Sequence, residues 1–235
     1  MIRKNSRILF VVIFILLCSI IPAFAAAVPT YTISGTVKDG SGKALSGVKV
    51  TVGSKHSMTL PNGSYKIAGL AKTNQAISVS LNGYVAASRN IKLVSDATHN
   101  FTLVKRDTII AKAKSFRGTP HRILDCSHFV NKVYQQVGLA YAYTDCSKIA
   151  SIGDFEKVST PLPGDIILFG PSPDKAEHMG IVIDPAKKQF IGAQSRGVAI
   201  AVYDGTQAWG NPKYNDRVNR AGYYKIAGFY RYKAQ

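Results

Sequence analysis

The 235-residue sequence has few cysteines and few acidic side chains. Of its three cysteines, only Cys126 and Cys146 lie beyond the first 26 residues. Thirteen Asp and Glu stand against thirty Lys and Arg, so the formal charge is +17. The zinc-finger spacing of cysteine and histidine is missing, as is any arginine–aromatic stripe, so nucleic-acid recognition is not expected. The charge favours polyanions such as anionic wall polymers, and it is equally consistent with an ordinary lysine-rich surface.

Residues 1–26 form a segment of their own. Three basic residues precede an uncharged apolar run that ends in "AFAA". This order of a positive, an apolar and a small-residue region is typical of a secretory signal peptide. We expect cleavage after Ala25 or one residue later, and export to the periplasm, the cell wall or the extracellular space. An uncleaved membrane anchor is the alternative. A second alternative is a lipoprotein signal with the lipid attached to Cys18. It is disfavoured because Leu17 stands where such signals have a small residue.

Residues 27–105 alternate apolar and polar side chains in short runs. "YTISGTV", "VKVTV", "YKIAGL", "AISVSL" and "HNFTLV" have the period of strands, and turn signals such as "LPNGSY" and "LNGYV" separate them. About seven strands and no helix predict an antiparallel β-sandwich. Over residues 31–104 the pattern resembles the carboxypeptidase regulatory-like, transthyretin-like sandwich. His56 and His99 are interpreted as ordinary surface residues, and no chemistry is expected here.

In residues 106–235 the spacing of apolar residues changes, first to that of helices and then back to that of strands. "DTIIAKAKSF" and "CSHFVNKVYQQVGL" place apolar side chains at helical spacing, and Gly138 stands where a helix would end. After Pro161, the runs "DIILF", "HMGIVID", "QFIGAQ", "VAIAVY" and "IAGFYRY" have the period of strands. Two helices followed by an antiparallel sheet predict an α+β domain. The composition shows no linker before it, so the two domains are expected to pack closely.

Cys126 opens the second of these helices, behind Asp125 as a candidate cap. Three interpretations of Cys126 are open: a packed thiol, one half of a disulfide with Cys146, or a nucleophile. A helix N-terminus and a nearby imidazole both lower the pKa of a thiol, which favours the nucleophile. His178 begins a strand and is the candidate base, whereas His128 lies about 200° round the helix from Cys126 and is expected to point away.

The order of these motifs resembles a known family. "GTPH…LDCSHFVNKVYQQVGL", "PLPGDIILF", "HMGIVID" and "QFIGAQSRGVAIA" are similar to NlpC-type, papain-like cysteine peptidases of bacterial cell walls, from about Asp107 to the C-terminus. The resemblance implies that Cys126 is the nucleophile and His178 the base. It also implies cleavage of peptidoglycan stem peptides, typically between γ-linked D-glutamate and a diamino acid, by a monomer without metal or organic cofactor.

The sequence departs from that family at the third polar residue, where Gly192 stands. Gln194 lies two residues on, on the same face of the strand, and is the predicted substitute that orients His178. His121 stands where relatives have a tyrosine that helps to hold the free amine of the substrate. Asp125 and Ser127 match residues that line this amine pocket, so all three are predicted to bind substrate.

Cys146 occupies a segment in which relatives usually carry Arg-x-Ser. If Cys126 is the nucleophile, it must be reduced, and Cys146 is then a free, half-buried thiol in a different part of the fold. An amidase or acyltransferase on the same fold is an alternative activity. A wall-binding protein without activity is the alternative from another class, although it has no need of a thiol at a helix start.

Overall fold

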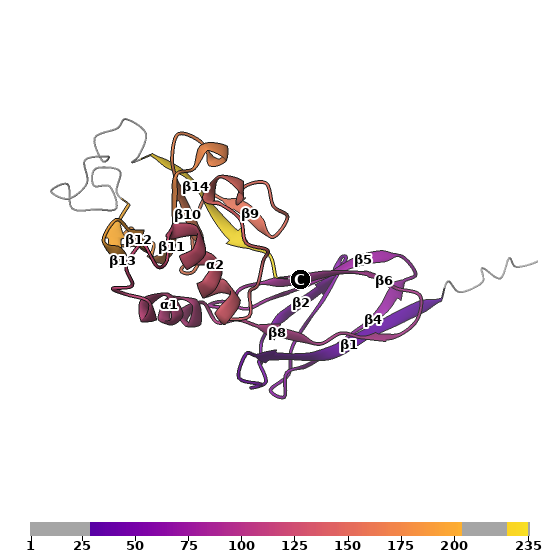
Figure 1. The fold of residues 1–235 in the computed structure, drawn as a ribbon. Helices are drawn as coiled ribbons and strands as arrows, with labels where there is room; N and C mark the ends of the chain where they lie inside the picture. The colour runs from indigo at the N-terminus through magenta and orange to yellow at the C-terminus, as the bar shows by residue number, and fades with distance from the viewer. Residues whose placement is uncertain (1–28, 204–224, 235) are drawn as a thin grey trace, which may run out of the picture.

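The computed structural model describes residues 29–203 and 225–234, which form two domains (Figure 1). The predicted signal peptide lies outside the described residues. Within the described part of the chain, no helix has the length and apolar character to cross a membrane. Strands β1–β8 build the first domain, and α1, α2 and strands β9–β14 build the second.

The first domain is a sandwich of two small sheets. One holds β4-β1-β7 with β8 also paired to β1, and the other holds β3-β2-β5-β6. Valines at alternate positions of β2 are buried between the sheets while Lys49 is exposed, which is the predicted period of two. The strands are β1 (Thr30–Asp39), β2 (Lys49–Val52), β3 (Lys55–Met58), β4 (Ser64–Ala71), β5 (Asn74–Ser80), β6 (Ala87–Lys92), β7 (Ala97–Thr98) and β8 (Phe101–Leu103).

The pairing differs from the prediction in one respect. The sandwich was expected to be antiparallel, but β1 pairs in parallel with both β7 and β8. The chain crosses from one sheet to the other after β6, and it returns along β1 in the same direction. The alternation of apolar and polar residues within one strand does not depend on which sheet the strand joins. The sequence pattern therefore does not reveal a crossover between sheets.

The second domain places two helices before an antiparallel sheet, as predicted, and the sheet has a sixth strand, β9, that the prediction lacked. Its order is β13-β12-β11-β10-β14-β9, and every pairing is antiparallel. The apolar face of α2 packs on β11 and β12 in the main core of the chain. The elements are α1 (Arg106–Ser115), α2 (Cys126–Gln136), the short helix η1 (Cys146–Lys148), β9 (Phe155–Val158), β10 (Ile166–Phe169), the short helix η2 (Pro173–Lys175), β11 (His178–Asp184), β12 (Gln189–Gln194), β13 (Gly197–Val202) and β14 (Ile226–Tyr232).

The two domains pack closely. Val85 of the sandwich is buried in the core of the second domain, and the amide of Arg106 donates to the carbonyl of Gly83 at 2.9 Å. Figure 1 shows β14 running toward the sandwich, where the amide of Ser88 donates to the carbonyl of Ala234 at 2.7 Å. A cleft of about 990 Å³ lies between the domains, lined among others by residues of β1, β6, α2 and β14.

A buried ion cluster joins the start of α1 to the sheet. Asp165 is 1% exposed and accepts from Arg106 and Arg231, each at 2.8 Å. Its second oxygen also accepts from the amide of Leu162 at 2.8 Å. Burying a carboxylate is costly unless it is paired and hydrogen-bonded, and here both conditions are met. The cluster therefore fixes α1 relative to β10 and β14.

Candidate active site

The start of α2 positions Cys126. Asp125 has extended backbone geometry, and its carboxylate accepts from the amide of His128 at 2.9 Å, so it caps the helix as predicted. Gly138, with φ 83°, follows the end of the helix. Cys126 is the first helical residue and is half-buried, so its sulfur lies at the positive end of the helix dipole.

The start of β11 positions His178, and aromatic rings surround its imidazole. The ring is 5% exposed and packs against Phe169 and Phe190, with centroids at 5.9 and 6.4 Å. Gly180 makes room for the Phe190 ring, because a Cβ there would lie 2.5 Å from it, and Gly192 makes room for the imidazole, because a Cβ there would lie 3.3 Å from Nε2 of His178. Packing on these rings therefore fixes the plane of the imidazole.

The structure brings Cys126 and His178 together, and it adds Cys146. The thiol of Cys126 is hydrogen-bonded to both residues. The bond with Cys146 and burial raise the pKa of Cys126 to about 12, and the hydrogen bond and charge of His178 only partly offset them. The prediction of a lowered pKa was therefore wrong, because a second thiol and a low-dielectric environment outweigh the imidazole.

Cys146 begins η1, and its sulfur donates to the carbonyl of Ala176 at 3.0 Å, two residues before His178. Both cysteines are free and Cys146 is half-buried, as predicted. The placement of Cys146 in a different part of the fold was wrong, because both sulfurs pack on the same core. The hydrogen bond from Cys126 lowers the pKa of Cys146, so the two thiols titrate as a pair.

Gln194 ends β12 and is 7% exposed. Its predicted hydrogen bond to the imidazole is not formed: among the described residues, neither amide atom of Gln194 has a hydrogen-bond partner. The physical reason is the position of the ring, whose Nε2 is turned toward Gly192 and its neighbour Phe190. The register of β11 and β12 nevertheless brings the end of β12 beside the start of β11.

A polar cluster flanks the helix start. Ser127 contacts the Asp125 carboxylate and the Tyr143 hydroxyl, each at 3.0 Å. The ring of His128 points away from Cys126, as expected, but it lies 2.8 Å from the second Asp125 oxygen and stacks on Tyr143 at 4.2 Å. Asp125 and Ser127 thus form one surface, and the hydrogen bonds from His128 and Ser127 outweigh partial burial and lower the pKa of Asp125.

His121 is not part of this cluster. It lies exposed in the turn before α2, whereas the residue that reaches Ser127 is Tyr143. Sequence reasoning missed Tyr143 because the segment before η1 has no periodicity. Its single signal is a tyrosine shortly before Cys146, in a chain where relatives hold the substrate amine with a tyrosine.

The comparisons assign each domain to a family. Residues 32–104 match the carboxypeptidase regulatory-like domain, and residues 112–216 match the NlpC/P60 family, so that match contains both Cys126 and His178. The second domain is an NlpC/P60 domain. The matched range contains both α2, which begins at Cys126, and β11, which begins at His178.

Solved NlpC/P60 structures resemble parts of the chain. The NlpC/p60 domain of the peptidoglycan hydrolase SagA is 29% identical, over 42% of this chain and 90% of its own, with a TM-score of 0.36. An NlpC/P60 family protein from Bacillus cereus ATCC 10987 is 22% identical, over 75% of this chain and half of its own, with a TM-score of 0.40. A search of the curated proteins finds no match.

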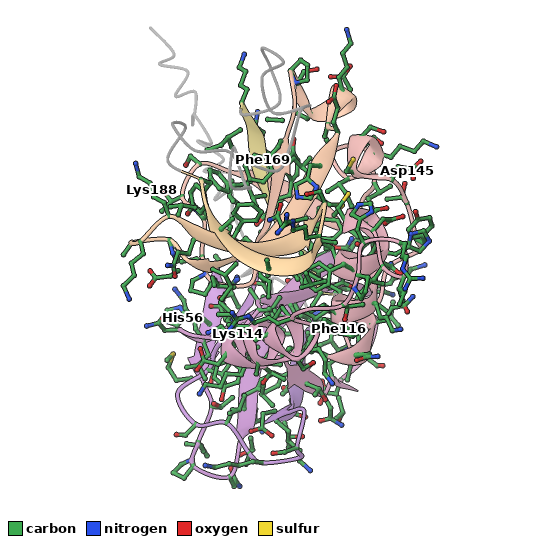
Figure 2. All side chains as sticks on the ribbon, turned by 60° about the vertical axis from the view of Figure 1, so that its left-hand side comes forward. His56, Lys114, Phe116, Asp145, Phe169 and Lys188 are labelled. Atoms are coloured by element: carbon green, nitrogen blue, oxygen red, sulfur yellow. The ribbon has the colours of Figure 1, made fainter. Side chains whose placement is uncertain are left out.

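Two residues adjoining the candidate site lie on the side of the second domain away from the sandwich. Figure 2 labels Asp145, which precedes Cys146, and Phe169, which packs on His178, and both lie toward the end of the domain away from the sandwich. The residues that line the cleft between the domains include none of the reactive groups. No group of three metal-ligating side chains occurs among the described residues. The groups gathered at the site are those of thiol and acid–base chemistry.

Proposed function

We propose that the protein is an exported cysteine peptidase that hydrolyses the peptide stems of peptidoglycan. The observation that carries the proposal is the hydrogen bond between Cys126, at the N-terminus of α2, and His178, at the start of β11, inside an NlpC/P60 domain. A nucleophile in contact with a buried base is the arrangement that covalent catalysis requires. The signal-peptide pattern of residues 1–26 supports export.

The raised pKa of Cys126 decides how the reaction begins. The hydrogen bond with Cys146 and burial raise the pKa of Cys126, which favours the protonated thiol as the starting state. His178 therefore takes the proton as the sulfur attacks the amide carbonyl, and it returns that proton to the departing amine. Water, deprotonated by His178, then hydrolyses the thioester. The backbone N–H of Cys126, free of helical partners at this end, is placed to stabilise the oxyanion.

Gln194 is proposed to act on the charged form of the imidazole. The Gln194 carboxamide is buried and makes no hydrogen bond in the resting structure, which costs free energy. This cost is recovered if the carboxamide gains a hydrogen-bond partner during the reaction. The imidazolium formed during the attack has two N–H donors, and the amide oxygen of Gln194 is an acceptor for one of them. In the resting structure the ring packs on Phe169 and Phe190.

The bond cleaved is proposed to join γ-linked D-glutamate to a diamino acid. Asp125, Ser127 and Tyr143 present a carboxylate and two hydroxyls next to the nucleophile, a set that suits the free amine of a short stem peptide. His121 is exposed before the same helix and remains a predicted contact for that substrate. The basic sandwich is proposed to hold the enzyme near anionic wall polymers.

Digestion of purified muropeptides with the mature chain, followed by mass spectrometry, tests this function. We expect products cut within the stem peptide and no release of intact stems from the glycan. Release of intact stems would show an amidase, and transfer to an added amine would show an acyltransferase. Labelling with a cysteine-reactive probe separates enzyme from wall-binding protein: an inert Cys126 together with intact muropeptides would overturn the proposal.

A further inference from the structure

The two cysteines beyond the predicted leader meet each other in the site. Cys126 and Cys146 are 20 positions apart in the sequence, yet their thiols are hydrogen-bonded and both pack on one core. The contact is fixed from the other side as well, because the sulfur of Cys146 donates to Ala176 in the segment that leads to His178. Acyl transfer by Cys126 and His178 makes no use of a second thiol.

We propose that Cys126 and Cys146 form a reversible disulfide that switches the enzyme off, with a small-molecule or protein disulfide as the oxidant. Loss of activity as the outcome rests on the proposed function, whereas formation of the bond does not. Once bonded to Cys146, the sulfur of Cys126 has no lone thiolate with which to attack a carbonyl. The NlpC/P60 domain is then inactive until a thiol reduces the bond.

The local structure allows the bond to close. A disulfide needs sulfurs about 2 Å apart, somewhat closer than two hydrogen-bonded thiols. Cys126 is fixed on a regular helix, but Cys146 begins a three-residue helix that follows an irregular stretch of residues 140–145. A small shift of η1, with loss of the bond to Ala176, brings the sulfurs together while α2 and β11 stay in place.

The chemistry balances as thiol–disulfide exchange. The Cys146 thiolate, whose pKa is lowered by its hydrogen bond with Cys126, attacks one sulfur of the external disulfide and releases one thiolate. Cys126 then gives up its proton to His178 and attacks the sulfur of Cys146, which breaks the mixed disulfide and releases the second thiolate. Each released thiolate takes one proton. The cysteine pair loses two electrons, and the external disulfide gains them.

The test uses the mature chain in buffers of reduced and oxidised glutathione at graded ratios. We expect the intact mass to fall by two hydrogens, a peptide map that links Cys126 to Cys146, and loss of muropeptide hydrolysis at the same ratio. Added dithiothreitol should restore all three. Formation of the 126–146 bond with hydrolysis unchanged would overturn the switch, and so would a chain that gains glutathione without ever forming that bond.

Two variants keep the test decisive. Cys146→Ser should stay active at ratios that inactivate the wild type, and it should need a ratio roughly tenfold or more oxidising before Cys126 binds glutathione, since it lacks the internal partner. Cys126→Ala should form no internal bond at any ratio. If the reduced wild type hydrolyses no muropeptide, the proposed function fails, yet the mass and peptide map still decide whether the bond forms. Equal sensitivity of wild type and Cys146→Ser would overturn the proposal.

Discussion

The sandwich and the NlpC/P60 domain are alike in charge but differ in what they bury. Each of residues 27–105 and 106–235 carries a net charge of +7. Among the described residues, Thr59 is the one buried polar side chain of the sandwich, whereas the second domain buries six. Those six are Arg106, Ser127, Asn131, Asp165, His178 and Gln194. Burying a polar group costs free energy unless it is paired, so the second domain depends more on specific polar contacts than the sandwich does.

The largest effect should come from removing the nucleophile. Cys126→Ala should abolish muropeptide hydrolysis, because the proposed acyl-enzyme forms on the sulfur of Cys126. His178→Ala should be nearly as severe, since the raised pKa of the thiol leaves attack dependent on a base. Hydrolysis rates followed by mass spectrometry check this, with circular dichroism to confirm folding. His56→Ala in the sandwich is the matched control and should act like wild type. Activity that survives Cys126→Ala would place the chemistry elsewhere.

The next largest effect should be on the free energy of unfolding, which should fall more when a buried polar group is removed from the second domain than from the sandwich. Asp165→Asn should cost about 3–5 kcal/mol of unfolding free energy, because it leaves Arg106 and Arg231 without their buried counter-charge. Thr59→Val removes two neutral hydrogen bonds, with Leu45 and Val48, and should cost about 1–3 kcal/mol. Urea unfolding of the two variants measures both losses. Equal losses would show that the buried carboxylate contributes no more to the free energy of unfolding than the Thr59 hydroxyl does.

The pH dependence of Cys126 should shift when its neighbour is removed. A thiol with a raised pKa forms thiolate only at high pH, and the hydrogen bond with Cys146 is the largest cause of the rise. Cys146→Ala should therefore move the pH profile of Cys126 alkylation to lower pH. Stopped-flow alkylation with iodoacetamide, with the site of modification identified by mass, measures the midpoint. A midpoint that stays in place would show that Cys146 does not contribute to this pKa, and a midpoint that rises would show that Cys146 lowers it.

Gln194→Ala should have a smaller effect than loss of the base. Positioned acid–base groups contribute about 10²–10⁴ in rate, and we expect the lower end because the imidazole itself remains. The loss should fall on kcat rather than KM, because Gln194 is proposed to act on the imidazolium formed during the attack. Gln189→Ala, at the other end of β12, is the matched control and should leave the rate unchanged. If Gln194→Ala turned over at the wild-type rate, Gln194 would have no role in orienting His178.

The smallest effect should come from the surface of the sandwich. Lys49→Gln and Lys66→Gln remove exposed charge without touching the core, so retention on insoluble wall should fall a few-fold at low salt. The difference should shrink as salt rises, because a Debye length of about 8 Å at 0.15 M screens exposed charges. Lys157→Gln and Lys188→Gln in the second domain are the matched pair. Cosedimentation gives retention, and unchanged hydrolysis of soluble muropeptides would show that the sandwich serves access only.

The regular elements could be predicted because local rules decide them. The helix of Cys126 has its cap, its apolar stripe and its terminal glycine in consecutive sequence, and the structure has all three. Strand β9 was missed because four residues of the type "FEKV", at the edge of a sheet, are too few to show a period. Their place beside β14 depends on a partner more than 60 residues away.

The proximity of Cys126 and His178 could be predicted, but their surroundings could not. Each residue stands at the start of a recognisable element, and the structure brings the two starts together. Cys146 and Tyr143 lie where backbone geometry is irregular, and only tertiary packing brings them to α2. The predicted bond of Gln194 failed for the same reason: the tilt of the His178 ring is set by Phe169 and Phe190, which no local pattern encodes.

The end of the chain ties the two domains together a second time. The covalent connection passes from the sandwich into α1, and a separate backbone contact joins Ala87 and Ser88 to Ala234. Two attachment points remove the free swivel that a single connection permits. A torque on one domain is therefore passed to the other through two separate connections, and the start of α2 keeps a fixed orientation relative to the sandwich.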